Sequence, residues 1–214
     1  MSWHGVALAL SLLALLANAL VIAALVGFLL SRGSATAHGA WETARDVLAP
    51  YALPAAFVVA AVATLGSLYF QFGAGFTPCD FCWFQRICMY PESLLLGIAA
   101  ARRDLATARW YVLPLAVVGS CISIYQTQLQ WFPTQVQGNC ASAGGVSCSS
   151  AQFLDLGFVS IPYLAGSAFL LVITLLLMAR RPDEVGEGVG EEEDVDETRS
   201  AEGSGPSRRP ALTR

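Results

Sequence analysis

The sequence predicts an all-α integral membrane protein: a four-helix transmembrane bundle with one extra N-terminal transmembrane helix. Three observations lead to this prediction. Hydrophobic residues make up 55% of the 214 residues and charged residues only 13%, well outside the soluble average. The apolar residues fall into five runs, each near the roughly 20 residues that a helix needs to cross a bilayer. Four of the five tryptophans, Trp3, Trp83, Trp110 and Trp131, lie at or just beyond the ends of these runs, as interfacial tryptophans do.

The first run covers residues 6–30, contains no charged residue and predicts a retained transmembrane helix. A cleaved signal peptide is the alternative, because Ala17-Asn18-Ala19 resembles a cleavage site. The residues before the run include no arginine and the run continues past Ala19, so we favour the retained helix. Residues 31–50 are polar and predict a connecting loop, within which a short amphipathic helix could form from 40 to 48.

The other four runs predict the helices of the bundle, at residues 52–72, 83–101, 110–131 and within 155–178. Pro162 falls near the start of the last helix, where a proline is tolerated. Glu92 lies inside the 83–101 run, and it either belongs to a proton path or simply faces the bundle interior. Cys88 and Cys121 also lie within the runs, and we expect them to be small buried hydrophobic residues.

Arginine counts predict the orientation in the plasma membrane. The 31–50 loop contains two arginines, the 102–109 loop contains three, and the segment after the last helix begins with two. The segments on the other side of the membrane contain a single arginine, Arg86. Because positively charged loops stay inside, we expect a cytoplasmic C-terminus and extracytoplasmic cysteine pairs, on the side where disulfides persist.

The chain is expected to have three parts: a transmembrane helix with a cytoplasmic loop at 1–50, a four-helix core at 51–181, and a cytoplasmic tail at 182–214. Ten of the sixteen acidic residues lie between Asp183 and Glu202, and this polar composition predicts a disordered tail. Nucleic acid is not an expected partner, because the twelve arginines form no basic patch with interleaved aromatic residues.

Cys79 and Cys82 form a C-x-x-C pair at the outer end of the 83–101 run. Such a pair can close a small, strained and easily reduced ring, which suits redox exchange. Arg86 follows Cys82 by four residues, so the two share a face if the segment is helical. A helix N-terminus and a nearby cation both favour a thiolate. The same spacing also fits an interfacial arginine that reaches to lipid headgroups.

Cys140 and Cys148 are too far apart for a C-x-x-C site. A disulfide between them would close a nine-residue ring and contribute about 2.6 kcal/mol in the chain-entropy model. That bond could be a structural staple or an exchangeable disulfide presented to a soluble partner. The four thiolates could instead bind zinc together, but one close pair and one wide pair match structural zinc sites poorly, so no metal is expected.

The stretch from Pro78 to Pro91 reads P-C-D-F-C-W-F-Q-R-I-C-M-Y-P. It resembles the DsbB/BdbC family of disulfide bond formation proteins, whose pattern is P-C-x-x-C-W-x-Q-R-I-x-M-Y-P. Leu129-Gln130 and the G-F-V-S-I-P-Y stretch at 157–163 add to the similarity, which covers roughly residues 52–178. The order of the cysteine pairs counts against the related vitamin K epoxide reductase family, where the C-x-x-C comes last.

The resemblance implies an enzyme of electron transport and oxidative protein folding. It would re-oxidise an extracytoplasmic thioredoxin-like (DsbA-like) protein and reduce a membrane quinone of the ubiquinone or menaquinone type. The implied catalytic residues are paired as Cys79–Cys82 and Cys140–Cys148. The reduced partner would attack Cys140, the freed Cys148 would attack Cys79, and Cys82 would leave as a thiolate beside the quinone.

The resemblance also implies that Arg86, Gln85 and Gln126 lie at the quinone site, with Arg86 polarising a quinone oxygen. Family members often carry a histidine where this chain has Gln126, whose amide can hydrogen-bond a quinone oxygen but cannot donate from a cationic ring. The alternative to a redox enzyme is a non-catalytic membrane protein whose cysteines form structural disulfides or a metal site. Its thiols would be inert to a reduced partner.

Overall fold

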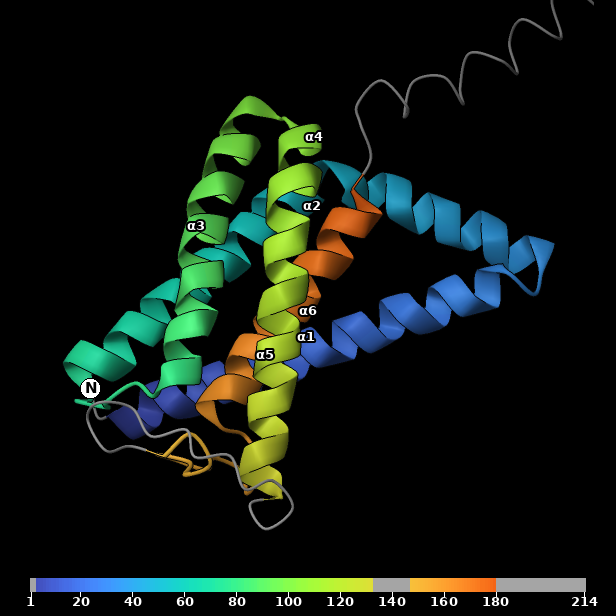
Figure 1. The fold of residues 1–214 in the computed structure, drawn as a ribbon. Helices are drawn as coiled ribbons and strands as arrows, with labels where there is room; N and C mark the ends of the chain where they lie inside the picture. Colours follow the sequence, from blue (N-terminus) through green and yellow to red (C-terminus); the bar gives the residue numbers. More distant parts are fainter. Residues whose placement is uncertain (1–2, 133–146, 180–214) are drawn as a thin grey trace, which may run out of the picture. The chain divides into compact units, whose positions relative to one another are not determined.

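The computed structural model describes residues 3–132 and 147–179, and the structural statements below concern these residues; the expected tail at 182–214 lies outside them. The helices are α1 (Trp3–Ser31), α2 (Ala35–Leu68), α3 (Asp80–Arg102), α4 (Leu105–Thr107), α5 (Leu113–Trp131) and α6 (Ile161–Met178) (Figure 1). Two π-helices, η1 (Tyr69–Gly73) and η2 (Ala108–Val112), follow α2 and precede α5. The described part of the chain contains no strand, and an isolated bridge joins Asp155 and Val159.

The helical segments confirm the prediction of an all-α membrane bundle with an additional N-terminal helix. Four segments are long and apolar enough to cross a membrane: α1, α2 with η1, the stretch from α4 through α5, and α6. Helix α3 is not among the four, since Gln85, Arg86 and Glu92 lower its hydropathy. It nevertheless runs alongside α5 (Figure 1). All three polar side chains are buried, so α3 keeps them inside the bundle.

Small residues let the helices approach closely. Helices α5 and α6 meet at Gly119, where an added Cβ would overlap the ring of Phe169, so the absence of a side chain makes room for that ring. Ala56, Ala60 and Ala116 have no exposed surface and extend this core. Small residues at helix interfaces are typical of bilayer proteins, in which close packing stabilises helix association.

Helix α1 packs against α2 and α6 and is tied to α6 by one polar side chain. The Asn18 Nδ2 donates to the hydroxyl of Tyr163 at 2.8 Å and to that of Ser167 at 2.9 Å. An amide group within a bilayer needs such partners. Asn18 is the central residue of the sequence that resembles a cleavage site, and in the structure it lies in the middle of a 29-residue helix.

The connection between α1 and α2 is much shorter than predicted, which corrects the loop expected at 31–50. Only residues 32–34 are non-helical, and α2 begins at Ala35 after Ser34 in extended backbone (φ −150°, ψ 135°). Four alanines, at positions 35, 37, 40 and 44, lie in the first three turns of α2 and favour a helix there. Pro50 and Pro54 lie inside α2 and do not end it, because neighbouring groups in a packed membrane helix can satisfy the freed backbone carbonyls.

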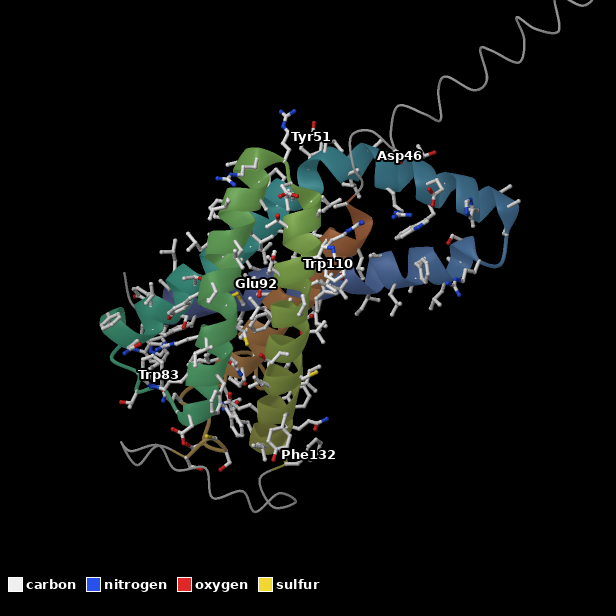
Figure 2. The ribbon with its side chains drawn as sticks, turned by 45° about the horizontal axis from the view of Figure 1, so that its top comes forward. Asp46, Tyr51, Trp83, Glu92, Trp110 and Phe132 are labelled. Atoms are coloured by element: carbon white, nitrogen blue, oxygen red, sulfur yellow. The ribbon has the colours of Figure 1, made fainter. Side chains whose placement is uncertain are left out.

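Two predictions about residues inside the apolar runs had different outcomes. Cys88 is buried in the core, as predicted, whereas Cys121 is exposed on α5 and that prediction was wrong. An apolar run predicts a membrane helix but does not show which face is turned toward lipid. Glu92 has no exposed surface, and neither carboxylate oxygen has a hydrogen-bond partner among the described residues. It therefore faces the bundle interior, midway along α3 (Figure 2).

Candidate redox site

The C-x-x-C pair lies at the N-terminus of α3. Cys79 is the N-cap residue in extended backbone (φ −81°, ψ 175°), and Cys82 lies in the first helical turn. Their Sγ atoms are 3.0 Å apart, within hydrogen-bonding distance for two free thiols. Cys79 is only 3% exposed, and Cys82 is partly exposed. The unpaired amides and positive dipole end of the helix favour negative charge here, as the sequence predicted.

Two glutamine side chains support the thiol pair from inside the bundle. The Gln126 Nε2 of α5 donates to the Sγ of Cys79 at 3.1 Å and to the Sγ of Cys82 at 3.7 Å. The Gln85 Nε2 of α3 donates to the Oε1 of Gln126 at 2.8 Å, which directs the amide of Gln126 toward the sulfurs. Both glutamines are almost fully buried. Gln126 therefore contacts the thiols themselves, a contact that sequence spacing could not predict.

The reduced pair holds its negative charge on Cys82, which precedes the predicted 83–101 span. The hydrogen bond from the Cys79 thiol is the largest influence on the pKa of Cys82 and lowers it. Burial raises this pKa and the Gln126 amide lowers it, and together these influences bring it to about 6. The charge of Arg86 also lowers this pKa but is the smallest of the causes. The hydrogen bond with Cys82, together with burial, raises the pKa of Cys79. At neutral pH Cys82 is thus a thiolate, both a nucleophile and a good leaving group.

Arg86 is buried and firmly anchored. Its Nε donates to the Ser67 hydroxyl at 2.9 Å, its Nη2 donates to the Ser67 carbonyl at 3.1 Å, and its Nη1 donates to the Gln71 Oε1. The guanidinium carbon lies 5.3 Å from the ring centroid of Trp83, near the same end of α3 (Figure 2). With 8% of its surface exposed, Arg86 does not reach out to headgroups as an interfacial arginine would.

Sequence reasoning missed Ser67 and Gln71, the two partners of Arg86. Both lie in the apolar run at 52–72. The signal for a buried polar site there was the presence of a serine and a glutamine among apolar residues. Gln71 lies within η1, the π-helix that ends the run. Such π-helical turns are rare and occur often at functional sites, because they change the direction in which side chains point.

A cavity of about 140 Å³ opens beside Cys82 and Arg86. Gln85 and Met89 of α3 also line it, and the remaining walls come mainly from apolar residues of α1, α2 and α6. Gln126 is not among the lining residues. A second, much smaller cavity is lined by Cys79, Cys82, Gln126 and residues of the 147–152 segment.

The second cysteine pair is only partly described. Cys148 is buried and disulfide-bonded, while Cys140 lies outside the described residues, so the Cys140–Cys148 pairing stays a prediction. Ser147 and Ser150 line the small cavity together with Cys79, which brings the Cys148 segment to the C-x-x-C pair. Among the described residues, no three His, Cys, Asp or Glu side chains gather as a metal site would require.

Replacing Gln126 with leucine is expected to raise the pKa of Cys82 in the reduced protein. In the parent protein the thiolate is present above about pH 6 and is protonated as the pH falls below that value. Loss of the amide donor disfavours the thiolate and moves this midpoint to higher pH. The rate of iodoacetamide modification of Cys82 against pH, followed by mass spectrometry, measures the midpoint. The matched control Gln128→Leu, at an exposed position of α5, should leave it unchanged; equal midpoints in both variants would refute the role of Gln126.

Comparisons with known proteins agree on one family. The family model described as "Disulfide bond formation protein DsbB" matches residues 50–179. A "Probable disulfide formation protein" of Chlamydia muridarum is 39% identical over 137 residues, covering 64% of this chain and 98% of the relative. "Disulfide bond formation protein C" of Bacillus subtilis is 43% identical over 128 residues, covering 60% and 91%. A "Probable disulfide formation protein" of Coxiella burnetii is 40% identical over 133 residues, covering 62% and 90%. No solved structure matches the chain significantly.

Proposed function

Because the chain belongs to the DsbB family of disulfide bond formation proteins, we propose that it re-oxidises an extracytoplasmic thioredoxin-like (DsbA-like) protein and passes the electrons to a membrane quinone. The partner dithiol loses two electrons and two protons and becomes a disulfide, and the quinone gains them and becomes a quinol. The relatives' names support the disulfide chemistry. The local arrangement of Cys79, Cys82 and Arg86 supports the route of the electrons.

The observation that carries this proposal is that Cys82 lines two cavities. The small cavity is shared with Cys79 and with Ser147 and Ser150, which lie on either side of Cys148. The larger cavity is shared with Arg86 and is mainly apolar. Cys79 lines the small cavity and not the larger one. The pair is therefore suited to receive electrons at Cys79 from a thiol relay and to release them at Cys82 toward the membrane.

The larger cavity fits a quinone ring in size and in chemistry. Its volume of about 140 Å³ resembles the roughly 150 Å³ of an apolar protein cavity that binds benzene. Three of the five N–H donors of Arg86 bond to Ser67 and Gln71, which leaves two for a ligand oxygen. Arg86 and Gln85 would hold the ring beside Cys82. A quinone bound there supplies an acceptor for two electrons and two protons.

The relay within the chain uses the two cysteine pairs in sequence. The partner's thiolate attacks Cys140 of the Cys140–Cys148 disulfide, and the released Cys148 attacks Cys79. Cys82 then leaves as a thiolate, which is favourable at neutral pH because its pKa is about 6. In the structure the Gln126 amide lies within reach of both sulfurs. The partner's second thiol would then break the bond between the partner and Cys140, so that the partner leaves as a disulfide. The freed Cys140 would attack Cys148, which re-forms Cys140–Cys148 and releases Cys79. The Cys79–Cys82 dithiol would close again as a disulfide, with its two electrons and two protons going to the quinone.

The arginine distribution supports a plasma-membrane protein with the redox site outside and the C-terminus inside. This orientation gives the thiol pairs access to secreted proteins that need disulfides. In inside-out membrane vesicles, added protease should remove an epitope fused to the C-terminus, whereas in right-side-out vesicles the epitope should survive. The reverse pattern would place the C-terminus outside and would contradict this orientation.

The direct test of the function is steady-state quinone reduction by the purified full chain in lipid nanodiscs under anaerobic conditions. A short-tailed ubiquinone serves as the acceptor and dithiothreitol as the dithiol, with the rate in empty nanodiscs subtracted. We expect the chain to consume one quinone for each dithiol oxidised. A non-catalytic protein with structural disulfides would give only the rate of empty nanodiscs, and that result would overturn the proposal.

A further inference from the structure

We propose that α1, which precedes the family-matched residues 50–179, forms the wall of the quinone cavity against which the isoprenoid tail lies. This inference rests on the proposed function, because it names a binding surface for the same acceptor. The family match contains the helices that carry the cysteines and Arg86 but not α1. In the structure α1 nevertheless supplies part of the cavity beside those residues.

The residues of α1 that line the cavity occupy one helical face. They are Leu10, Leu13, Ala14 and Ala17, at the i, i+3, i+4 and i+7 positions that fall on one side of a helix. The wall that α2 and η1 form extends from Val59 to Gln71. At 1.5 Å per residue this wall is about 18 Å long, far longer than a single quinone ring. A chain attached to a ring beside Cys82 would therefore continue along the wall beyond the ring.

Several polar groups of the cavity gather beside Cys82. Cys82, Gln85 and Arg86 all come from the first two turns of α3, and Gln71 of η1 bonds to Arg86 there. The four residues of α1 are leucine and alanine only. A quinone has the same division, with a polar ring and an apolar isoprenoid chain. With the ring beside Cys82, the chain would contact the leucines and alanines of α1.

Two sets of contacts fix α1 in this position. At its start, Trp3 packs edge-on against Phe76 with ring centroids 5.4 Å apart. In its middle, Asn18 donates to Tyr163 and Ser167 of α6, which α1 crosses (Figure 1). The cavity-lining residues lie between these two anchors. Gly66 of α2 adds to the fit, because an added Cβ there would come within 3.1 Å of the Leu10 side chain.

The first test enlarges a cavity residue and compares it with a matched outward residue. Ala14 is buried and lines the cavity, whereas Ala19 is exposed on the same helix and does not. Ala14→Phe should raise the KM for a long-tailed quinone by about tenfold, since the added ring fills space that the tail would occupy, and should lower the amount of quinone retained after purification. The KM for the dithiol should not change, and Ala19→Phe should behave like the parent in every measurement.

A second test uses the unaltered chain, so it does not depend on the folding of a variant. A quinone that carries a photoreactive group in its tail is bound, irradiated, and located by tryptic mass spectrometry. Because the chain has no lysine, trypsin cuts after the arginines and separates the three main walls: α1 in the peptide ending at Arg32, α2 in 46–86 and α6 in 110–180. We expect label on the first peptide, at residues 10–17.

The outcomes separate this inference from the proposed function. Suppose that the parent chain reduces quinone and that Ala14→Phe and Ala19→Phe retain and reduce quinone equally well. Helix α1 then does not contact the tail, and the inference is overturned while the proposed function stands. Label confined to the α2 and α6 peptides would overturn it in the same way. If the parent chain does not reduce quinone at all, the proposed function fails, and the inference fails with it.

Discussion

Replacing Cys82 with serine is expected to abolish quinone reduction, with turnover falling by about a thousandfold or more, as when a nucleophile that acts in a catalytic unit is removed. Cys82 is the cysteine that lines both cavities and that carries the thiolate in the reduced pair. A serine hydroxyl is nearly isosteric but can neither form the Cys79–Cys82 disulfide nor ionise near neutral pH. Quinone absorbance under the anaerobic assay conditions measures the loss.

Cys121→Ser is the matched control, because Cys121 is exposed on α5 and lines neither cavity. It should keep the turnover of the parent chain. In Cys82→Ser, Cys79 is left as a free thiol, but the proposed Cys140–Cys148 disulfide can still exchange with the thiols of the partner. Thiol exchange with the partner should therefore persist while quinone reduction does not. Parent-level quinone reduction in Cys82→Ser would rule out electron release at this sulfur.

Replacing Arg86 with methionine is expected to lower quinone turnover by about 10²–10³-fold, the size of effect seen when a preorganised donor to a developing oxyanion is removed. Methionine fills much of the same volume but has no N–H donor, and its introduction leaves Ser67 and Gln71 without their arginine partner. The charge of Arg86 is the smallest cause of the lowered pKa of Cys82. The alkylation midpoint of Cys82 should therefore stay near pH 6 while quinone reduction falls.

Arg86→Lys separates charge from geometry. A lysine keeps the positive charge but cannot reproduce the fork of donors that bonds Ser67 and Gln71, so its turnover should lie between those of the parent chain and Arg86→Met. If Arg86→Met instead moved the Cys82 midpoint to high pH and left the KM for quinone unchanged, Arg86 would act on the thiolate and not on the acceptor.

Much of the fold follows from residue types that act locally. Long uncharged runs require helices in a bilayer, so the sequence predicts the membrane bundle and the positions of most helices. The C-x-x-C motif directly before an apolar run predicts thiols at a helix N-terminus, and α3 begins at Asp80 as this requires. The predicted loop at 31–50 was wrong because polarity alone does not indicate a loop, and alanine-rich polar segments form helices readily.

The parts that the sequence could not predict depend on contacts between distant residues. The bond from Gln85 to Gln126 joins residues 41 positions apart, and the bonds from Asn18 to α6 join residues more than 140 apart. No local pattern specifies such pairs. Cys121 shows the same limit, since its exposure depends on how α5 is rotated against α3 and α6.

The most direct test of the central claim, that electrons pass from the Cys79–Cys82 pair to a quinone, is a single-turnover measurement on the protein alone. The chain is fully reduced, freed of reductant, and mixed anaerobically with a short-tailed ubiquinone while quinone absorbance and free thiols are followed together. We expect two thiols to disappear for every quinone reduced, with Cys79 and Cys82 recovered as a disulfide. Thiols that stay reduced while quinone remains unconsumed would contradict it.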